Sequence, residues 1–256
     1  MDAGKRADQA ETQVRLNRFL SELGICSRRE ADRLIEAGRV TVEGRTASMG
    51  QKVQPGQSVE IDGKDVRPKG PVRKRILAVH KPVGVVCTTD RRWGDPVLED
   101  LLDIPERVFP VGRLDKLSDG LILMTNQGDL ANEIMKACNY HEKEYVVKVD
   151  HPISELFLER MRQGVFLKEL NVKTRPCEVS RMGERTFRIV LTQGLNRQIR
   201  RMCGELGYRV VSLTRIRILN VQLDQLPAGG WRDLTEEEGE QLKKLLYSKS
   251  AKKPRR

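Results

Sequence analysis

Residues 111–126 have the sequence VGRLDKLSDGLILMTN, a polar segment that leads into an apolar run. The apolar run LILMTN predicts a buried strand, and the preceding VFPVG predicts another. Gly112 and Gly120 border the polar residues and permit tight backbone turns. The segment therefore predicts a loop between two strands with Asp115 near its centre. Taken alone, an Arg-Leu-Asp triplet is typical of an ordinary surface turn.

The segment GRLDKLSDGLILMTN resembles the catalytic motif of pseudouridine synthases, in the branch that joins an S4 domain to the synthase domain. These enzymes isomerise uridine in RNA, and the resemblance assigns their essential aspartate to Asp115. Asp119 stands at a position that varies in the family. We therefore leave Asp119 out of the predicted catalytic set.

Two further segments resemble the family in the expected order. HKPVGVVCTTD, residues 80–90, is similar to its first strand and loop. HEKEYVVKVD, residues 141–150, is similar to the element that contributes an active-site tyrosine, which assigns that role to Tyr145. A tyrosine offers a flat face for the target base and a hydroxyl for proton movement. Without the resemblance, a tyrosine that enters a strand is more often a core residue.

A basic segment, GLNRQIRRMCGELGY at residues 194–208, resembles the element that supplies a cationic partner for the aspartate, here Arg200. An adjacent guanidinium would keep the carboxylate ionised and fix its orientation, so an ion pair between Arg200 and Asp115 is expected. The alternative is that Arg200 contacts phosphate, as we expect of Arg197 and Arg201. The resemblance also assigns an apolar residue of the uracil pocket to Leu213, in VVSLTRIRI.

The implied reaction breaks the N-glycosidic bond, turns the base and joins its C5 to the same sugar carbon. A carboxylate that is held ionised and aimed can serve such a reaction as nucleophile or as base, and the sequence leaves both routes open. Arg113 is the candidate for holding the phosphate of the nucleotide, because a base must leave its stack to be modified.

Towards the amino terminus, the apolar spacing from Leu16 to Leu23 predicts one short helix. Ser27 and Glu30 predict a capping box that opens a second helix. Short alternating segments follow, so two helices lead into a small sheet. VRLNRFLSELGICSRREADRLIEAGRVTVEG, within residues 14–66, resembles the S4 RNA-binding domain. The candidate RNA-binding arginines of the two helices are Arg18, Arg28, Arg29 and Arg33.

The composition favours a polyanionic partner. Lys and Arg total 47 against 36 Asp and Glu, which gives a formal charge of +11 and a pI near 9.6. No apolar run reaches the roughly 20 residues that span a bilayer, and the amino terminus lacks the apolar core of a signal peptide, so we expect a cytoplasmic protein without a membrane partner. The five cysteines form no CxxC pair, and the three histidines have no shared-metal spacing, so no metal is expected. The sequence also has no GxxxxGK(S/T) and no GxGxxG, so no other cofactor is expected.

Together these features predict an α+β protein with a small S4 RNA-binding domain and a synthase domain built on a mixed, largely antiparallel sheet. The expected partner is ribosomal RNA, with large-subunit RNA preferred and transfer RNA as an alternative, and a monomer is the default. The predicted divisions are a disordered lead at 1–13, the S4 domain at 14–66, a linker at 67–75, the catalytic domain at 76–247 and a basic tail at 248–256.

Two functions of other classes compete with this prediction. A noncatalytic ribosome assembly factor would bind RNA through the S4 module, yet it would need a lost catalytic residue, and Asp115, Tyr145 and Arg200 are all present. A glycoside hydrolase usually needs a second carboxylate across the scissile bond, and the sequence identifies no such pair.

Overall fold

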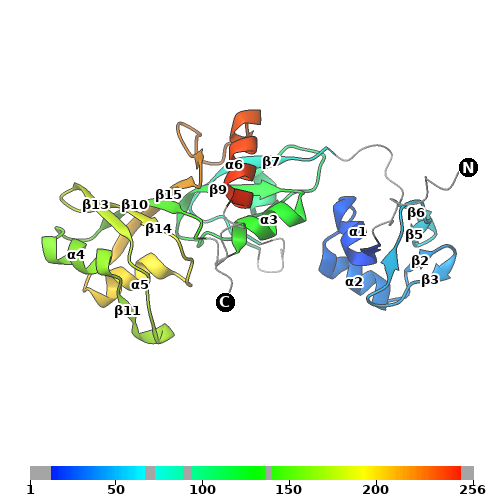
Figure 1. Cartoon of the computed structure of the whole chain (residues 1–256), viewed down its shortest axis with the longest axis horizontal. Helices are drawn as coiled ribbons and strands as arrows, with labels where there is room; N and C mark the ends of the chain where they lie inside the picture. Colours follow the sequence, from blue (N-terminus) through cyan, green and yellow to red (C-terminus); the bar gives the residue numbers. More distant parts are fainter. Residues whose placement is uncertain (1–12, 67–72, 89–93, 137–139, 249–256) are drawn as a thin grey trace, which may run out of the picture. The chain divides into compact units, whose positions relative to one another are not determined.

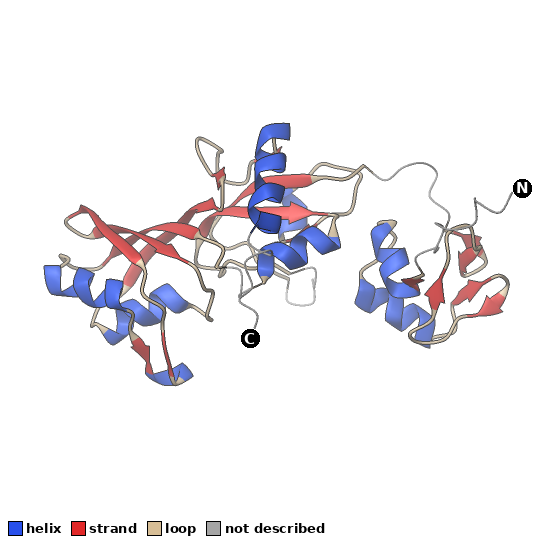
Figure 2. Cartoon of the chain, viewed as in Figure 1, coloured by secondary structure: helices blue, strands red, loops and turns tan. Residues whose placement is uncertain are grey.

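The computed structural model describes residues 13–66, 73–88, 94–136 and 140–248 of the chain (Figures 1 and 2). It divides into two compact units, Met1–Lys74 with Pro105–Arg107, and Arg75–Ile104 with Val108–Arg256. Most of the predicted lead, linker and tail lies outside the described residues. Arg75, the last residue of the predicted linker, is instead anchored in the second unit, where its guanidinium pairs with Asp233 at 2.7 Å.

The first unit packs two helices on small sheets. The helices are α1 (Leu16–Glu22) and α2 (Arg28–Glu36). A four-stranded sheet has the order β3-β2-β5-β6, and β1 pairs with β4. The bounds are β1 (Val14–Arg15), β2 (Val40–Val42), β3 (Arg45–Thr46), β4 (Lys52–Val53), β5 (Val59–Ile61) and β6 (Lys64–Asp65). Leu16, Leu20 and Ile35 are buried against Val40 and Val59, so the apolar stripes predicted from the sequence form the core of this unit.

Only half of the predicted capping box is formed. The hydroxyl of Ser27 accepts a hydrogen bond from the backbone N–H of Glu30 at 3.1 Å, as expected of an N-cap. The Glu30 carboxylate does not complete the box by a described contact to Ser27; it accepts a hydrogen bond from Arg33 one turn further on, at 3.1 Å. Because that arginine lies at i+3 on the same helix face, it competes for the carboxylate.

The second unit is built on a nine-stranded mixed sheet with the order β13-β14-β10-β15-β9-β7-β17 (Figure 1). Short β16 and β8 pair with β15 and β9. Only β15 and β9 run parallel among the described pairs of this sheet, which confirms the predicted largely antiparallel arrangement. The strands are β7 (Ile76–Lys81), β8 (Phe109–Pro110), β9 (Asp119–Thr125), β10 (Lys143–Val149), β13 (Glu178–Gly183), β14 (Thr186–Leu191), β15 (Val210–Ile218), β16 (Val221–Gln222) and β17 (Trp231–Asp233).

Helices cover the two halves of this sheet (Figure 2). α3 (Gly128–Met135) and α6 (Glu236–Ser248) pack on β7 and β9, and α4 (Glu155–Gln163) and α5 (Gln198–Glu205) pack on the half that contains β10 and β14. Strands β11 (Phe166–Leu167) and β12 (Val172–Lys173) form a separate two-stranded sheet, and the short helix η3 (Lys168–Leu170) lies between them in the chain. Another short helix, η1 (Leu98–Leu101), precedes β8. Helix α6 was not predicted from the sequence, although its Leu242 and Leu246 are fully buried.

The apolar run of the opening motif becomes β9, which is buried on both faces. Leu121 and Leu123 face the core under α3 and α6. Ile122 and Met124 face the opposite core with Leu98. A strand covered on both sides is expected to be a continuous apolar run, which explains why β9 lacks polar alternation. The loop that carries Asp115 is thereby anchored to an interior strand of the sheet.

Candidate active site

The Asp115 loop joins β8 to β9 and is held by backbone hydrogen bonds. The carbonyl of Asp115 accepts from the N–H of Ser118 at 3.0 Å, which closes a tight turn. The carbonyl of Lys116 accepts from the N–H of Gly84 at 2.8 Å, and the N–H of Leu114 reaches the Sγ of Cys87 at 3.3 Å. A turn within the motif and two residues of the preceding 80–90 segment thus fix the backbone of the loop, while the Asp115 side chain remains half-buried.

A cavity of about 540 Å³ opens beside this loop. Its lining comes from the Asp115 loop, the end of α3, β10, β15, the end of β14 with the segment that follows it, and the start of α5. The predicted catalytic and substrate residues all line it, as does one predicted RNA-binding residue: Arg113, Asp115, Tyr145, Arg197, Arg200 and Leu213. Segments that are far apart in the sequence therefore meet at one cavity.

Arg200 approaches the aspartate loop in a different way from the one we expected. Its guanidinium donates to the carbonyl of Leu117 at 2.7 Å and to the hydroxyl of Ser118 at 3.1 Å. In the described part of the chain, no ion pair within 4.0 Å joins it to Asp115. Burial lowers the pKa of Arg200, as does the charge of Arg197, while the charge of Asp115 raises it. Arg200 therefore braces the loop through its backbone and lies within electrostatic reach of the carboxylate.

Tyr145 and Leu213 form the apolar part of the cavity. Both are buried, with 9% and 5% of their surface exposed, and both belong to the core under α4 and α5. Tyr145 is thus a core residue and a cavity residue at once, so the two interpretations of this tyrosine do not exclude each other. An aromatic ring and a leucine on adjacent strands provide a flat apolar surface of the kind that a nucleobase requires.

Three cations of the cavity were missed from the sequence: Lys136 after α3, and the strand residues Lys143 and Arg215. Arg215 is 3% exposed, and its Nε donates to the carbonyl of Leu121 at 2.6 Å. The Nζ of Lys143 donates to the carbonyl of His141 at 3.3 Å. Strand alternation could have revealed the two strand residues, because Lys143 lies two residues before Tyr145 and Arg215 two residues after Leu213.

Burial and, to a smaller extent, the charge of Arg215 together lower the pKa of Lys143 to about 8. The unfolded chain therefore binds more protons than the native protein between about pH 8 and 10.5, and stability rises with pH across that window. We expect Lys143→Met to stabilise the protein at pH 7 by about 2 kcal/mol and to flatten this rise. Urea unfolding from pH 7 to 10.5 measures both effects. Lys148→Met, on an exposed position of the same strand, is the control.

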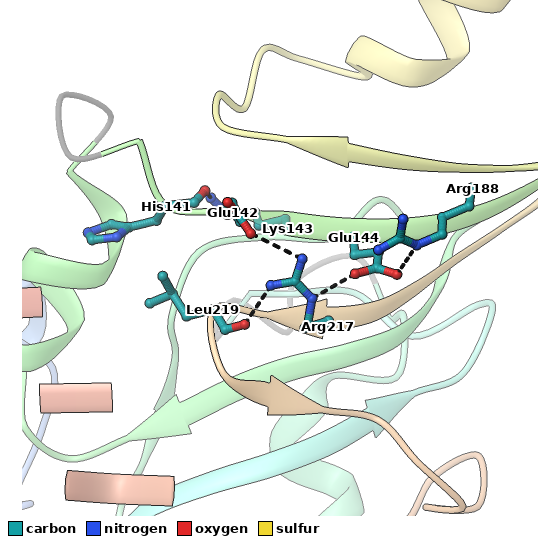
Figure 3. Close-up of polar contacts among 7 residues, drawn as sticks. All are labelled: His141, Glu142, Lys143, Glu144, Arg188, Arg217 and Leu219. Atoms are coloured by element: carbon teal, nitrogen blue, oxygen red, sulfur yellow. Dashed lines mark hydrogen bonds and ion pairs between the residues drawn. The ribbon is translucent and has the colours of Figure 1, made fainter. Parts of the chain in front are cut away.

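An ionic network crosses the face of β10 that points away from the cavity (Figure 3). Glu144, with a side chain only 9% exposed, accepts hydrogen bonds from Arg188 on β14 and from Arg217 on β15, the latter at 2.6 Å. Arg217 also pairs with Glu142 at 3.1 Å and donates to the carbonyl of Leu219 at 2.7 Å. Hydrogen bonding from Arg188 is the main cause that lowers the pKa of Glu144. Ion pairs thereby connect the three neighbouring strands β14, β10 and β15.

This network accompanies a β-bulge that sets which side chains face the cavity. Glu144 pairs with Arg217, whereas the next residue, Tyr145, pairs with Arg215, so Ile216 is the extra residue of β15. The bulge lets Arg215 line the cavity while Arg217 binds Glu144 on the other face. The network therefore favours the register that presents Lys143 and Tyr145 to the cavity.

The predicted arginines of the first unit lie on its helices. The side chains of Arg28, Arg29 and Arg33 are exposed, and Arg18 pairs with Glu22 at 2.6 Å. Exposed arginines on a helix are suited to phosphate contacts, and RNA binding by these four residues remains a prediction.

The residues suited to metal binding do not gather in the described part of the chain, where no group of three or more His, Cys, Asp or Glu side chains could hold an ion. Among the described helices, none is long and apolar enough to cross a membrane.

The cavity brings together a buried aromatic surface, a half-buried carboxylate and several guanidinium groups, a combination suited to an enzyme that modifies a base within a polyanion. Comparisons with known proteins give the family. The model for RNA pseudouridylate synthases matches residues 75–205, and the S4 domain model matches residues 14–59. By these matches the chain belongs to the RNA pseudouridylate synthase family, and it is an RNA pseudouridine synthase with an S4 domain.

Relatives match along most of the chain. The dual-specificity RNA pseudouridine synthase RluF of Escherichia coli (strain K12) is 48% identical over 241 residues, which cover 94% of this chain and 82% of that protein. Ribosomal large subunit pseudouridine synthase B of Shigella flexneri is 35% identical over 242 residues, covering 91% and 83%. A crystal structure of a pseudouridylate synthase superposes with a TM-score of 0.66 at 26% identity, covering 90% of this chain and 99% of that one. The assembly-factor and glycoside hydrolase alternatives are therefore set aside.

Proposed function

We propose that this synthase converts a uridine of large-subunit ribosomal RNA to pseudouridine, with Asp115 as the reacting group. The observation that supports the catalytic assignment is the convergence of Asp115, Tyr145, Arg200 and Leu213 on one cavity from four separate segments. The names of the relatives from Escherichia coli and Shigella flexneri support the substrate, since one is called dual-specific for RNA and the other acts on the large ribosomal subunit.

Each side chain has a role that follows from its place. Tyr145 and Leu213 would hold the uracil between apolar surfaces, while Asp115 acts on the sugar or the base as nucleophile or base. Arg200 is a positioning residue, because it binds the carbonyl of Leu117 and the hydroxyl of Ser118 in the aspartate loop. Arg113 is exposed at the cavity and is placed to neutralise the phosphate of the extruded nucleotide.

The S4 unit would add salt-sensitive affinity for folded RNA through Arg18, Arg28, Arg29 and Arg33 on its helices. We also expect a monomeric cytoplasmic enzyme. In the synthase unit, Arg197 and Arg201 at the start of α5 would contact the RNA backbone. The enzyme would then choose its target among many uridines by the shape of the surrounding RNA and not by a linear sequence. The uracil base cannot provide this choice, because it presents the same atoms to the cavity at every uridine.

Pseudouridine mapping tests the substrate. Ribosomal and transfer RNA from cells that lack this gene should gain a modified uridine in the large-subunit RNA after treatment with the wild-type protein. A modification confined to transfer RNA would show that the substrate assignment is wrong and the family assignment right. Sites in both RNAs would show that this chain acts on two kinds of RNA. Free RNA and ribosomal particles should be tested side by side.

A further inference from the structure

A second cavity, of about 680 Å³, lies on the other side of the arginines that border the candidate active site. Arg197 and Arg200 line both cavities. The second cavity is otherwise formed by the later part of α5 and by η3 with the end of β11. The two cavities are thus neighbours that share a wall of two guanidinium groups.

The lining of this second cavity carries more positive than negative charge. The charged lining residues are Lys168, Glu169, Arg197, Arg200, Arg201 and Glu205. Both carboxylates are already engaged: Glu205 pairs with Lys168 at 3.5 Å, and Glu169 pairs with Arg201. Arg197 is exposed, and the Nε of Arg200 is buried without a hydrogen-bond partner. The described lining includes no aromatic ring on which a base could stack.

We propose that this second cavity binds a phosphodiester of the RNA strand that flanks the target uridine. The inference rests on the proposed function, because it requires a uridine in the first cavity. A strand that places its base beside Asp115 continues past the shared wall, and its next phosphates need cations there. Charged groups without a stacking surface are suited to the backbone and not to a base.

Arg201 is the cation best oriented for this task. Its Nε donates to the carbonyl of Asn196 at 3.0 Å and its Nη2 to the Asn196 side chain at 3.2 Å, so its remaining Nη1 is directed at Glu169. The Arg201 side chain is 22% exposed, whereas that of Glu169 is 73% exposed. An ion pair with one partner so accessible is weak, and a phosphate can replace the carboxylate on the prearranged guanidinium.

Glu169 therefore competes with RNA for Arg201. We expect Glu169→Gln to lower the Kd for substrate RNA about two- to fivefold at low ionic strength, where screening is least, with kcat unchanged. Glu155→Gln is the matched control, because Glu155 forms an exposed pair with Arg181 at 2.8 Å on the same unit and the substitution changes the net charge equally. The control should shift the Kd by much less.

The experiment measures Kd and kcat of wild type, Glu169→Gln and Glu155→Gln with a ribosomal RNA fragment that contains the mapped uridine. The same fragment with uncharged methylphosphonates flanking that uridine should abolish the advantage of Glu169→Gln. The proposed phosphodiester site would be overturned if Glu169→Gln and Glu155→Gln lowered the Kd equally. It would also be overturned if Glu169→Gln still lowered the Kd for the fragment with methylphosphonate linkages. Failure of the wild type to modify any large-subunit RNA would instead overturn the proposed substrate, so the two failures are distinguishable.

Discussion

Asp115→Asn is expected to reduce turnover about 10⁴-fold or more while leaving the fold and RNA affinity near those of the wild type. Asparagine has the size of aspartate but no charge, so it can act neither as nucleophile nor as base. The loop should keep its shape, because the described contacts that hold it are made by the Asp115 backbone and by its neighbours Leu114, Lys116 and Ser118. Single-turnover assays on the mapped RNA, with thermal unfolding and RNA binding of the same sample, measure the three properties.

Asp119→Asn is the matched control for this prediction. Asp119 lies four residues further along the motif, and its carboxylate accepts a hydrogen bond from the hydroxyl of Thr214 at 2.9 Å. Asparagine retains an acceptor oxygen there, so we expect turnover to remain near that of the wild type. An Asp115→Asn protein that retains wild-type turnover would show that the reacting group lies elsewhere.

Gly120→Ala is expected to destabilise the second unit by at least about 3 kcal/mol, which lowers Tm by roughly 10 °C. Gly120 has a φ of +108°, and a Cβ atom there would lie 2.3 Å from the carbonyl oxygen of Arg215 and 2.5 Å from its nitrogen. Those are backbone atoms of the one parallel strand pair described in the sheet, β9 with β15, so no side-chain rotation relieves the clash. Calorimetric unfolding measures the loss.

Gly229→Ala separates the clash from the cost of a positive φ. Gly229 has a φ of +82°, and a Cβ atom there would have nothing within 4 Å. We expect it to cost about 1 kcal/mol, from backbone strain alone. Equal losses of stability in the two variants would show that the close approach of β9 and β15 is not what requires glycine at position 120.

The sequence predicted the elements that depend on local periodicity. The stripe of Leu16 and Leu20, the N-cap at Ser27 and the apolar run of β9 are encoded within a turn or a strand, and all three occur in the structure. The helix α6 was missed because it begins with an acidic segment, TEEEGEQ, and has only a short apolar stripe after it, so helical periodicity is difficult to recognise there. Leu242 and Leu246 are recognisable as core residues only when α3 and the sheet are in place to cover them.

The sequence alone determined that Asp115 lies in a loop before an apolar strand, and its resemblance to a family determined the class of reaction. Tertiary structure decided which cations reach that loop. Arg200 binds the Leu117 carbonyl instead of the Asp115 carboxylate, and Arg215 donates to the Arg113 carbonyl, whereas the bulge at Ile216 turns Arg217 to the other face of the sheet. Such contacts depend on strand register and on side-chain reach between segments some 80 to 100 residues apart, which local periodicity does not encode.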